Sequence, residues 1–123
     1  MRLNQITIKV TDLEASIEFY KKLGLRLIVC TGNPYARFED EEGNTTFSLS
    51  VVDQAIPGDS GLYFETDDLE NEVVRLQRAG INFETEITKH TYLWTEIWFR
   101  DPDGHRLCLY HAGRNRRFPP WRL

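Results

Sequence analysis

The chain has 123 residues, of which 41% are hydrophobic and 28% are charged, and its formal net charge is −4. This length suits one domain with a buried core, and the acidic balance argues against a general nucleic-acid role, which needs a basic face. The sequence shows no hydrophobic run of signal-peptide type and no stretch of membrane-spanning length. Cys30 and Cys108 form no CxxC pair and are typical of free thiols in a reducing compartment, with a single disulfide as the alternative. We expect a cytoplasmic protein that binds neither nucleic acid nor membrane.

The first half of the chain predicts the element order β-α-β-β-β. An alternating strand over 5–10 precedes an amphipathic helix, with Asp12 as the N-cap and Gly24 as the residue that ends it. The helix carries one apolar stripe with the i, i+4, i+7 spacing of a buried face. Further strands are expected over 26–30, 35–39 and 45–52.

The second half repeats this order at a constant offset. Ile17 falls on Val73 and Gly24 on Gly80, and Asp68 precedes the second helix as Asp12 precedes the first. The expected strands cover 61–66, 82–87, 93–100 and 106–110. The sequence therefore predicts an α+β fold of two tandem βαβββ modules. We expect a single domain over 1–123, with module one at 1–54, a linker at 55–60, module two at 61–112 and a tail at 113–123.

Alternation gives four of the predicted strands one apolar face, which the helices can cover, and one mixed polar face. A polar face is usually solvated, but this one is mixed rather than charged throughout. Aromatic walls with a few polar groups are typical of a small-molecule cavity. The expected ligand-binding wall is the polar-face set Gln5, Thr7, Lys9, Ser48, Ser50, Tyr63, Glu65, Cys108 and Tyr110.

Two segments carry a resemblance to a known family. Residues 8–24, IKVTDLEASIEFYKKLG, and residues 100–107, RDPDGHRL, resemble the vicinal oxygen chelate superfamily, which includes glyoxalase I, bleomycin-resistance proteins and dioxygenases. The DPDG turn alone is a weak signal, whereas its combination with the V-x-D-x-x-x-S-x-x-F-Y start is specific. The resemblance implies that the modules form a curved mixed sheet with helices on its convex side and a site on its concave side. It also implies a homodimer.

Enzymes of this family hold one divalent metal with four inward side chains, usually His, Glu or Gln. The matching positions are Gln5, Ser48, Gly61 and Cys108, where the match of Ser48 assumes a one-residue shift from Phe47. Gln is an acceptable ligand, Ser a poor one, Gly has no side chain, and Cys prefers softer metals. We expect no metal and no other cofactor. The alternative is a divalent metal held by substituted ligands.

Other residues that could carry chemistry give weaker signals. His90, His105 and His111 are expected at the surface, and Cys108 lacks an inward base that would make it a nucleophile. Lys9 matches a position that can bind an anionic substrate group in glyoxalase-like proteins. The tail carries four arginines and a Phe-Pro-Pro-Trp segment, and we expect it to dock on the same subunit or on a partner, with a disordered terminus as the alternative.

Two functions remain open at this point. One is a metal-free protein of the bleomycin-resistance type that binds a small organic molecule. The other is a lyase, isomerase, transferase or dioxygenase that uses substituted metal ligands, or that uses Lys9 and Glu65 as acid and base. We favour the first, whose ligand would be a planar or acidic molecule stacked on Tyr63 or Tyr110 with its negative group at Lys9. The sequence identifies no catalytic residue.

Overall fold

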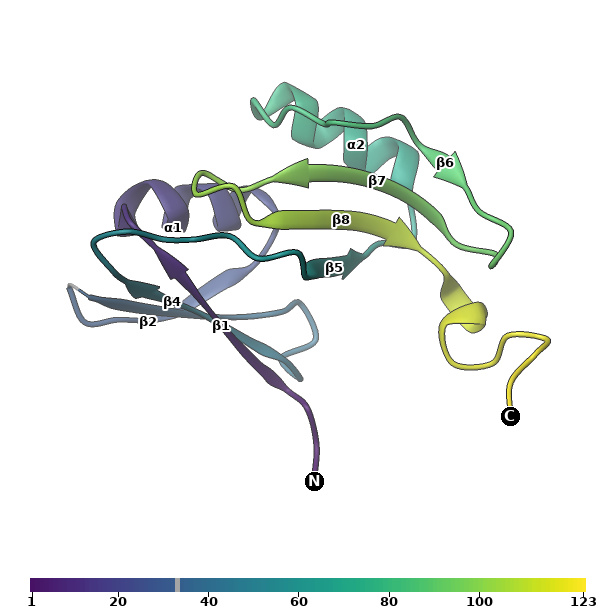
Figure 1. Ribbon diagram of the computed structural model, residues 1–123, viewed down its shortest axis with the longest axis horizontal. Helices are drawn as coiled ribbons and strands as arrows, with labels where there is room; N and C mark the ends of the chain where they lie inside the picture. The colour runs from purple at the N-terminus through teal and green to yellow at the C-terminus, as the bar shows by residue number, and fades with distance from the viewer. Residues whose placement is uncertain (33) are drawn as a thin grey trace. The chain divides into compact units, whose positions relative to one another are not determined.

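The computed structural model describes residues 1–32 and 34–123 (Figure 1). The chain divides into two compact units, of which the first comprises Met1–Pro57 with Asp101–Asp103 and the second Gly58–Arg100 with Gly104–Leu123. Each unit has one α-helix and one four-stranded mixed sheet, which confirms the α+β fold of two βαβββ modules. The finer boundaries of a single domain stay a prediction. No helix in the described part of the chain is long and apolar enough to cross a membrane.

The first unit is built around a sheet with the strand order β1-β4-β3-β2. Strand β1 runs parallel to β4, and the other neighbours are antiparallel. Its elements are β1 (Gln5–Val10), α1 (Leu13–Lys22), β2 (Arg26–Cys30), β3 (Tyr35–Glu39) and β4 (Thr46–Val51).

Helix α1 begins and ends as its sequence predicts. The side chain of Asp12 accepts a hydrogen bond from the Ala15 amide at 3.0 Å, and Gly24 follows the helix with a φ of 94°, a conformation that glycine adopts without steric cost. Tyr20 and Ile17 are buried on the face that contacts the sheet. The Tyr20 hydroxyl donates to Oδ2 of buried Asp101 at 2.7 Å, so Asp101 is part of this unit's core.

The second unit repeats the pattern with the strand order β5-β8-β7-β6. Helix α2 buries Leu69, Val73 and Leu76, and it contacts β8. The side chain of Asp68 caps α2 by accepting from the Asn71 amide at 3.3 Å. The elements are β5 (Gly61–Glu65), α2 (Leu69–Arg78), β6 (Thr88–Lys89), β7 (Thr95–Arg100), β8 (Arg106–His111) and the short 3-10 helix η1 (Gly113–Arg116).

The prediction of a strand over 82–87 is wrong. This segment makes only an isolated bridge between Phe83 and Phe99, and the edge strand β6 is a two-residue pair further along. The Glu84 amide still donates to the Trp98 carbonyl at 2.8 Å, but the Trp98 amide donates to the side chain of Thr85 instead of a main-chain carbonyl. A threonine hydroxyl therefore replaces one rung of the ladder and ends the pairing.

Candidate functional site

The face of the second sheet that lies opposite the α2-facing side chains is aromatic. Strand register places Tyr63 beside Cys108 and Trp98 beside the same Cys108, so all three share this face. The Tyr63 ring meets Trp98, Tyr110 and Trp94 edge to face, with centroids 5.4, 5.6 and 6.0 Å away. Trp94 stacks on Tyr110 at 4.7 Å. These contacts form one continuous aromatic cluster.

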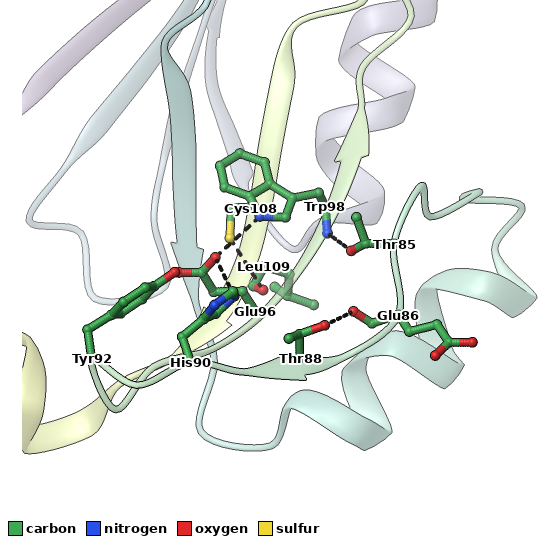
Figure 2. A network of polar contacts seen from close by, with 9 residues as sticks. All are labelled: Thr85, Glu86, Thr88, His90, Tyr92, Glu96, Trp98, Cys108 and Leu109. Carbon is green, nitrogen blue, oxygen red and sulfur yellow. Dashed lines mark hydrogen bonds and ion pairs between the residues drawn. The ribbon is translucent and has the colours of Figure 1, made fainter.

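A buried carboxylate lies within this cluster. Glu96 is only 4% exposed, and three donors surround it (Figure 2). The Tyr92 hydroxyl donates to Oε1 at 2.8 Å, and the indole Nε1 of Trp98 donates to Oε2 at 3.3 Å. Nε2 of His90 lies 3.4 Å from the same Oε2. Donors on both oxygens satisfy the carboxylate, as burial of an acidic group requires.

A tight turn brings two of these donors to Glu96. The His90 amide donates to the Trp94 carbonyl at 2.8 Å and closes a three-residue loop, in which Leu93 has a φ of 69°. A non-glycine residue with this backbone is strained, so the surrounding contacts must hold it. The loop stacks the His90 ring on the Tyr92 ring at 4.7 Å with an interplanar angle of 5°. His90 therefore contacts the buried carboxylate, and 33% of its side chain is exposed.

A pocket of about 340 Å³ opens beside Glu96, and all of its walls come from the second unit. One side is the aromatic sheet face and its turn, and the other is the C-terminal tail. The lining residues are Tyr63, Tyr92, Trp94, Glu96, Asn115, Arg116, Pro119 and Trp121.

Glu65 holds the tail in place as the wall of this pocket. Its Oε1 accepts from the amides of Ala112 and Gly113 at 3.2 and 2.9 Å, and its Oε2 lies 3.3 Å from Nε of Arg116. A carboxylate at the start of η1 satisfies amides that have no partner within the helix. The tail thus docks on its own chain.

The protonation of this face follows from burial and from Glu96. Burial first, and then the hydrogen bond to Glu96 and its charge, raise the pKa of Tyr92 to about 12. Burial followed by the charge of Glu96 raises the pKa of the Cys108 thiol to about 12. Burial is also the main reason that the pKa of Tyr110 is raised to about 12. These groups stay neutral at physiological pH, so Cys108 is no thiolate nucleophile there.

The polar face of the first unit carries a separate hydrogen-bond chain. Gln5 donates to Oγ of buried Ser48 at 2.8 Å, and Ser48 shares a 2.6 Å hydrogen bond with the Tyr35 hydroxyl. Nε of Arg37 donates to the same hydroxyl at 2.8 Å. The hydrogen bond with Ser48, and then those from Arg37 and its charge, lower the pKa of Tyr35. Sequence reasoning missed Tyr35, which lies on β3 and has no motif to mark it.

The structure distributes the nine expected wall residues over both units. In each unit the strand register places its members on one face of the sheet. Tyr63 lines the pocket and Glu65 anchors the tail, whereas Cys108 and Tyr110 lie buried behind the lining. The first unit contains Gln5, Thr7, Lys9, Ser48 and Ser50, with Lys9 Nζ 3.4 Å from the hydroxyl of Ser50. A single wall made of all nine residues stays a prediction.

Glu96 and its donors are the main residues that the expected set lacks. The pattern Trp94-Thr95-Glu96-Ile97-Trp98 places Glu96 and Trp98 at alternate positions of β7, hence on one face, and it places Trp94 two residues before Glu96, directly ahead of the strand. That spacing is a signal which could have identified Glu96. The position of His90 depends on the turn at Leu93, which no glycine or asparagine marks.

The residues at the family's four metal positions do not fit a metal site. The amide oxygen of Gln5 already accepts from the Thr46 hydroxyl, and the Cys108 thiol is buried and protonated. A side chain at position 61 would meet the Trp98 ring, because a Cβ there would lie 2.9 Å from it. Among residues 1–32 and 34–123, no three His, Cys, Asp or Glu side chains are grouped so as to hold a metal ion.

The indole at Gly61 is fixed by its surroundings. Its Nε1 donates to Glu96, its face carries the guanidinium of Arg106 at 4.5 Å, and the edge of Tyr63 lies 5.4 Å away. Three contacts of this kind oppose rotation of Trp98 away from Gly61. The aromatic cluster thus occupies the space that a ligand side chain from position 61 would need.

Comparisons with known proteins identify the family. The model of the Glyoxalase/Bleomycin resistance protein/Dioxygenase superfamily matches residues 2–109. A trivalent organoarsenical cleaving enzyme of Bacillus sp. (strain MD1) is 30% identical over 91% of this chain and 74% of its own. A probable enzyme of the same name from Bacillus subtilis is 27% identical over 94% and 83%. A lactoylglutathione lyase structure from Agrobacterium tumefaciens shares the fold, with a TM-score of 0.75, 17% identity and coverage of 90% and 93%.

Proposed function

Since this chain belongs to the Glyoxalase/Bleomycin resistance protein/Dioxygenase superfamily, we propose that it is a small-molecule-binding member that works without a metal. Its ligand occupies the aromatic pocket of the second unit. The observation that carries this proposal is the pocket of about 340 Å³ with aromatic walls and one buried carboxylate. Clefts of this size and composition, with few polar groups, are typical of sites for small organic molecules.

The contacts of Glu65 and Lys9 count against acid–base catalysis by this pair. Glu65 accepts from two main-chain amides and pairs with Arg116, so its lone pairs already serve the tail. The Nζ of Lys9 donates a hydrogen bond to the hydroxyl of Ser50 at 3.4 Å. The raised pKa of the Cys108 thiol counts against a covalent mechanism as well. Binding without chemistry therefore suits these side chains better. The wall of all nine residues expected from the sequence stays a prediction.

Metal analysis and native mass spectrometry of the purified protein test this function together. We expect less than a tenth of an equivalent of Ni, Zn, Fe, Mn or Mg, no large thermal shift with these ions, and a co-purified or added aromatic molecule that binds one per chain. One equivalent of tightly bound metal would contradict the proposal.

A second candidate function is the cleavage of trivalent organoarsenicals. The observation in its favour is the 30% identity to a relative that carries this name over 91% of the chain. The test is incubation of the protein, with and without added divalent metal, with a trivalent methylarsenical. Release of inorganic arsenite at a rate above that of a heat-denatured sample would establish this activity and replace the binding function. We expect no release.

A further inference from the structure

We propose that the pocket around Glu96 selects organic cations, specifically a quaternary ammonium or similarly soft cationic group held in an aromatic cage. This inference rests on the proposed small-molecule function and names the ligand class for the same site. It departs from the acidic ligand expected from the sequence, whose negative group would meet Lys9, because Lys9 is not among the residues that line this pocket.

Four aromatic rings line the pocket, and their surfaces are accessible. Tyr63, Tyr92 and Trp121 are 48%, 42% and 56% exposed, and Trp94 lies between them in contact with the first two rings. The faces of such rings carry negative electrostatic potential and attract cations within about 6 Å of the centroid, and Trp attracts them best. The cage therefore favours a cation whose charge is spread over an apolar surface.

The charged side chains that line the pocket also favour a cationic ligand. Its two charged lining residues are Glu96 and Arg116. The Nε of Arg116 forms an ion pair with Glu65, a residue that does not line the pocket. The carboxylate of Glu65 therefore offsets the positive charge of Arg116. Among residues 1–32 and 34–123, the basic side chain within ion-pair distance of Glu96 is His90, and this ring is charged only when protonated. The other two donors to Glu96 are the neutral groups of Tyr92 and Trp98.

The pocket also disfavours negative charge. The charge of Glu96 contributes, after burial, to the raised pKa values of Tyr63, Tyr92 and Cys108. Each of these shifts means that an anion at that position is destabilised. The part of these shifts that comes from the charge of Glu96 would oppose a ligand anion and favour a ligand cation, whereas the part that comes from burial would oppose either charge.

The charge of Arg106 opposes this preference in part, because it lowers the pKa values of Tyr63 and Cys108 that burial and Glu96 raise. Arg106 does not line the pocket; its guanidinium lies over the Trp98 ring and donates to the Asp59 carbonyl at 3.0 Å. The Trp98 ring therefore already carries a cation, whereas the other four rings line the pocket. A ligand cation would complete the cage on the pocket side.

Three probes of similar shape separate charge from hydrophobicity: phenyltrimethylammonium, its neutral isostere tert-butylbenzene, and the anion benzenesulfonate. Trp94, Trp98 and Trp121 are the three tryptophans of the chain, and all belong to the second unit. Intrinsic fluorescence titration of the full chain therefore reports on this unit alone. We expect the cation to bind at least tenfold more tightly than the neutral isostere, and the anion to bind most weakly.

Glu96→Gln preserves the shape of the side chain and removes its charge. We expect it to weaken binding of phenyltrimethylammonium at least tenfold and to leave tert-butylbenzene unchanged, which also shows that the pocket is still formed. Glu70→Gln, on the exposed surface of α2, is the matched control and should alter neither titration.

The outcomes distinguish the two proposals. Equal affinity for the cation and the neutral isostere would overturn the cation preference and leave small-molecule binding intact. Tighter binding of benzenesulfonate would also overturn it and would assign the charge recognition to Arg116. Failure of all three probes to bind would overturn both proposals. If Glu96→Gln does not fold, the comparison of the three probes on the unaltered chain still decides the question.

Discussion

Cys30 and Cys108 are the same chemical group in opposite environments. Cys30 is an exposed free thiol, and Cys108 is a fully buried one whose pKa is raised to about 12 by burial and by Glu96. At pH 8 a thiol with this pKa is ionised on the order of once in 10⁴ molecules, and only the thiolate reacts with alkylating reagents. The environment therefore sets both access and reactivity.

We predict that iodoacetamide modifies one thiol of the native protein at pH 8, and that this thiol is Cys30. Peptide mass spectrometry after alkylation would identify it, and denaturant should release the second. Rapid native modification of Cys108 would show that the sheet face opens on the time scale of the reaction. Without denaturant, the Cys30→Ser variant should therefore show no alkylation by iodoacetamide above the background of the assay.

Leu93 is the one described non-glycine residue with a positive φ, at 69°. Its Cβ is crowded there at a cost of about 1–2 kcal/mol, whereas asparagine tolerates this backbone better. We predict that Leu93→Asn stabilises the protein by about 0.5–1 kcal/mol in chemical denaturation. Leu93→Ala also shortens the leucine but lacks the amide with which asparagine can hydrogen-bond to the local main chain, so it serves as the control. Equal effects of the two substitutions would exclude relief of backbone strain as the cause.

At the scale of elements, the sequence predicted the ends of both helices correctly, because a single residue type sets each of these boundaries. Asp12 and Asp68 cap the helices as their side chains predict, and Gly24 and Gly80 follow them with φ of 94° and 92°. The edge of the second sheet was not predictable in this way. Phe83 and its neighbours alternate like a strand, but the hydroxyl of Thr85 takes a main-chain donor that pairing requires.

The site was predictable only in part, for a related reason. Sheet parity placed Tyr63 correctly on the aromatic face, because alternation is a property of each strand. The convergence of His90 and Tyr92 on Glu96 depends on a loop whose backbone lacks any marker residue. The docking of the tail depends on Glu65, which sequence alone cannot assign to amides 47 and 48 residues away.

The tail is an element whose position depends on one carboxylate. Replacing Glu65 with Gln removes the ion pair with Arg116 and weakens the bonds from the amides of Ala112 and Gly113. We predict that Glu65→Gln makes the bonds after Arg114 and Arg116 more susceptible to trypsin by about threefold to tenfold, since a change of about 1 kcal/mol in local opening has this effect. Limited proteolysis followed by mass spectrometry would measure it.

The matched control for this experiment is Glu70→Gln, which makes the same chemical change on α2. Its cleavage rate at the tail should equal that of the unaltered chain. An unchanged rate for Glu65→Gln itself would mean that Pro119 and Trp121, rather than the carboxylate, keep the tail against the pocket.

At the scale of the whole molecule, we propose that the chain forms a homodimer, as its resemblance to the superfamily implied. The tail contacts its own chain through Glu65 and lines that chain's pocket. We therefore predict a dimer at micromolar concentration in sedimentation velocity, and we expect deletion of 114–123 to preserve it while weakening probe binding. A monomer for the full chain would refute the dimer, and a monomer only after deletion would place the tail at the interface.

The Trp98 ring covers the position of Gly61, so a metal ligand is difficult to introduce there by single mutations. A mutation of Gly61 to histidine, taken alone, would force its Cβ against an indole that Glu96, Arg106 and Tyr63 hold in place. A mutation of Trp98 first would remove a donor from the buried carboxylate and the ring beneath Arg106 before any ligand is gained. Either order of the two mutations passes through a less stable intermediate. Family membership alone therefore does not predict the chemistry of this site. Membership of the superfamily therefore does not place this chain one substitution away from a histidine ligand at position 61.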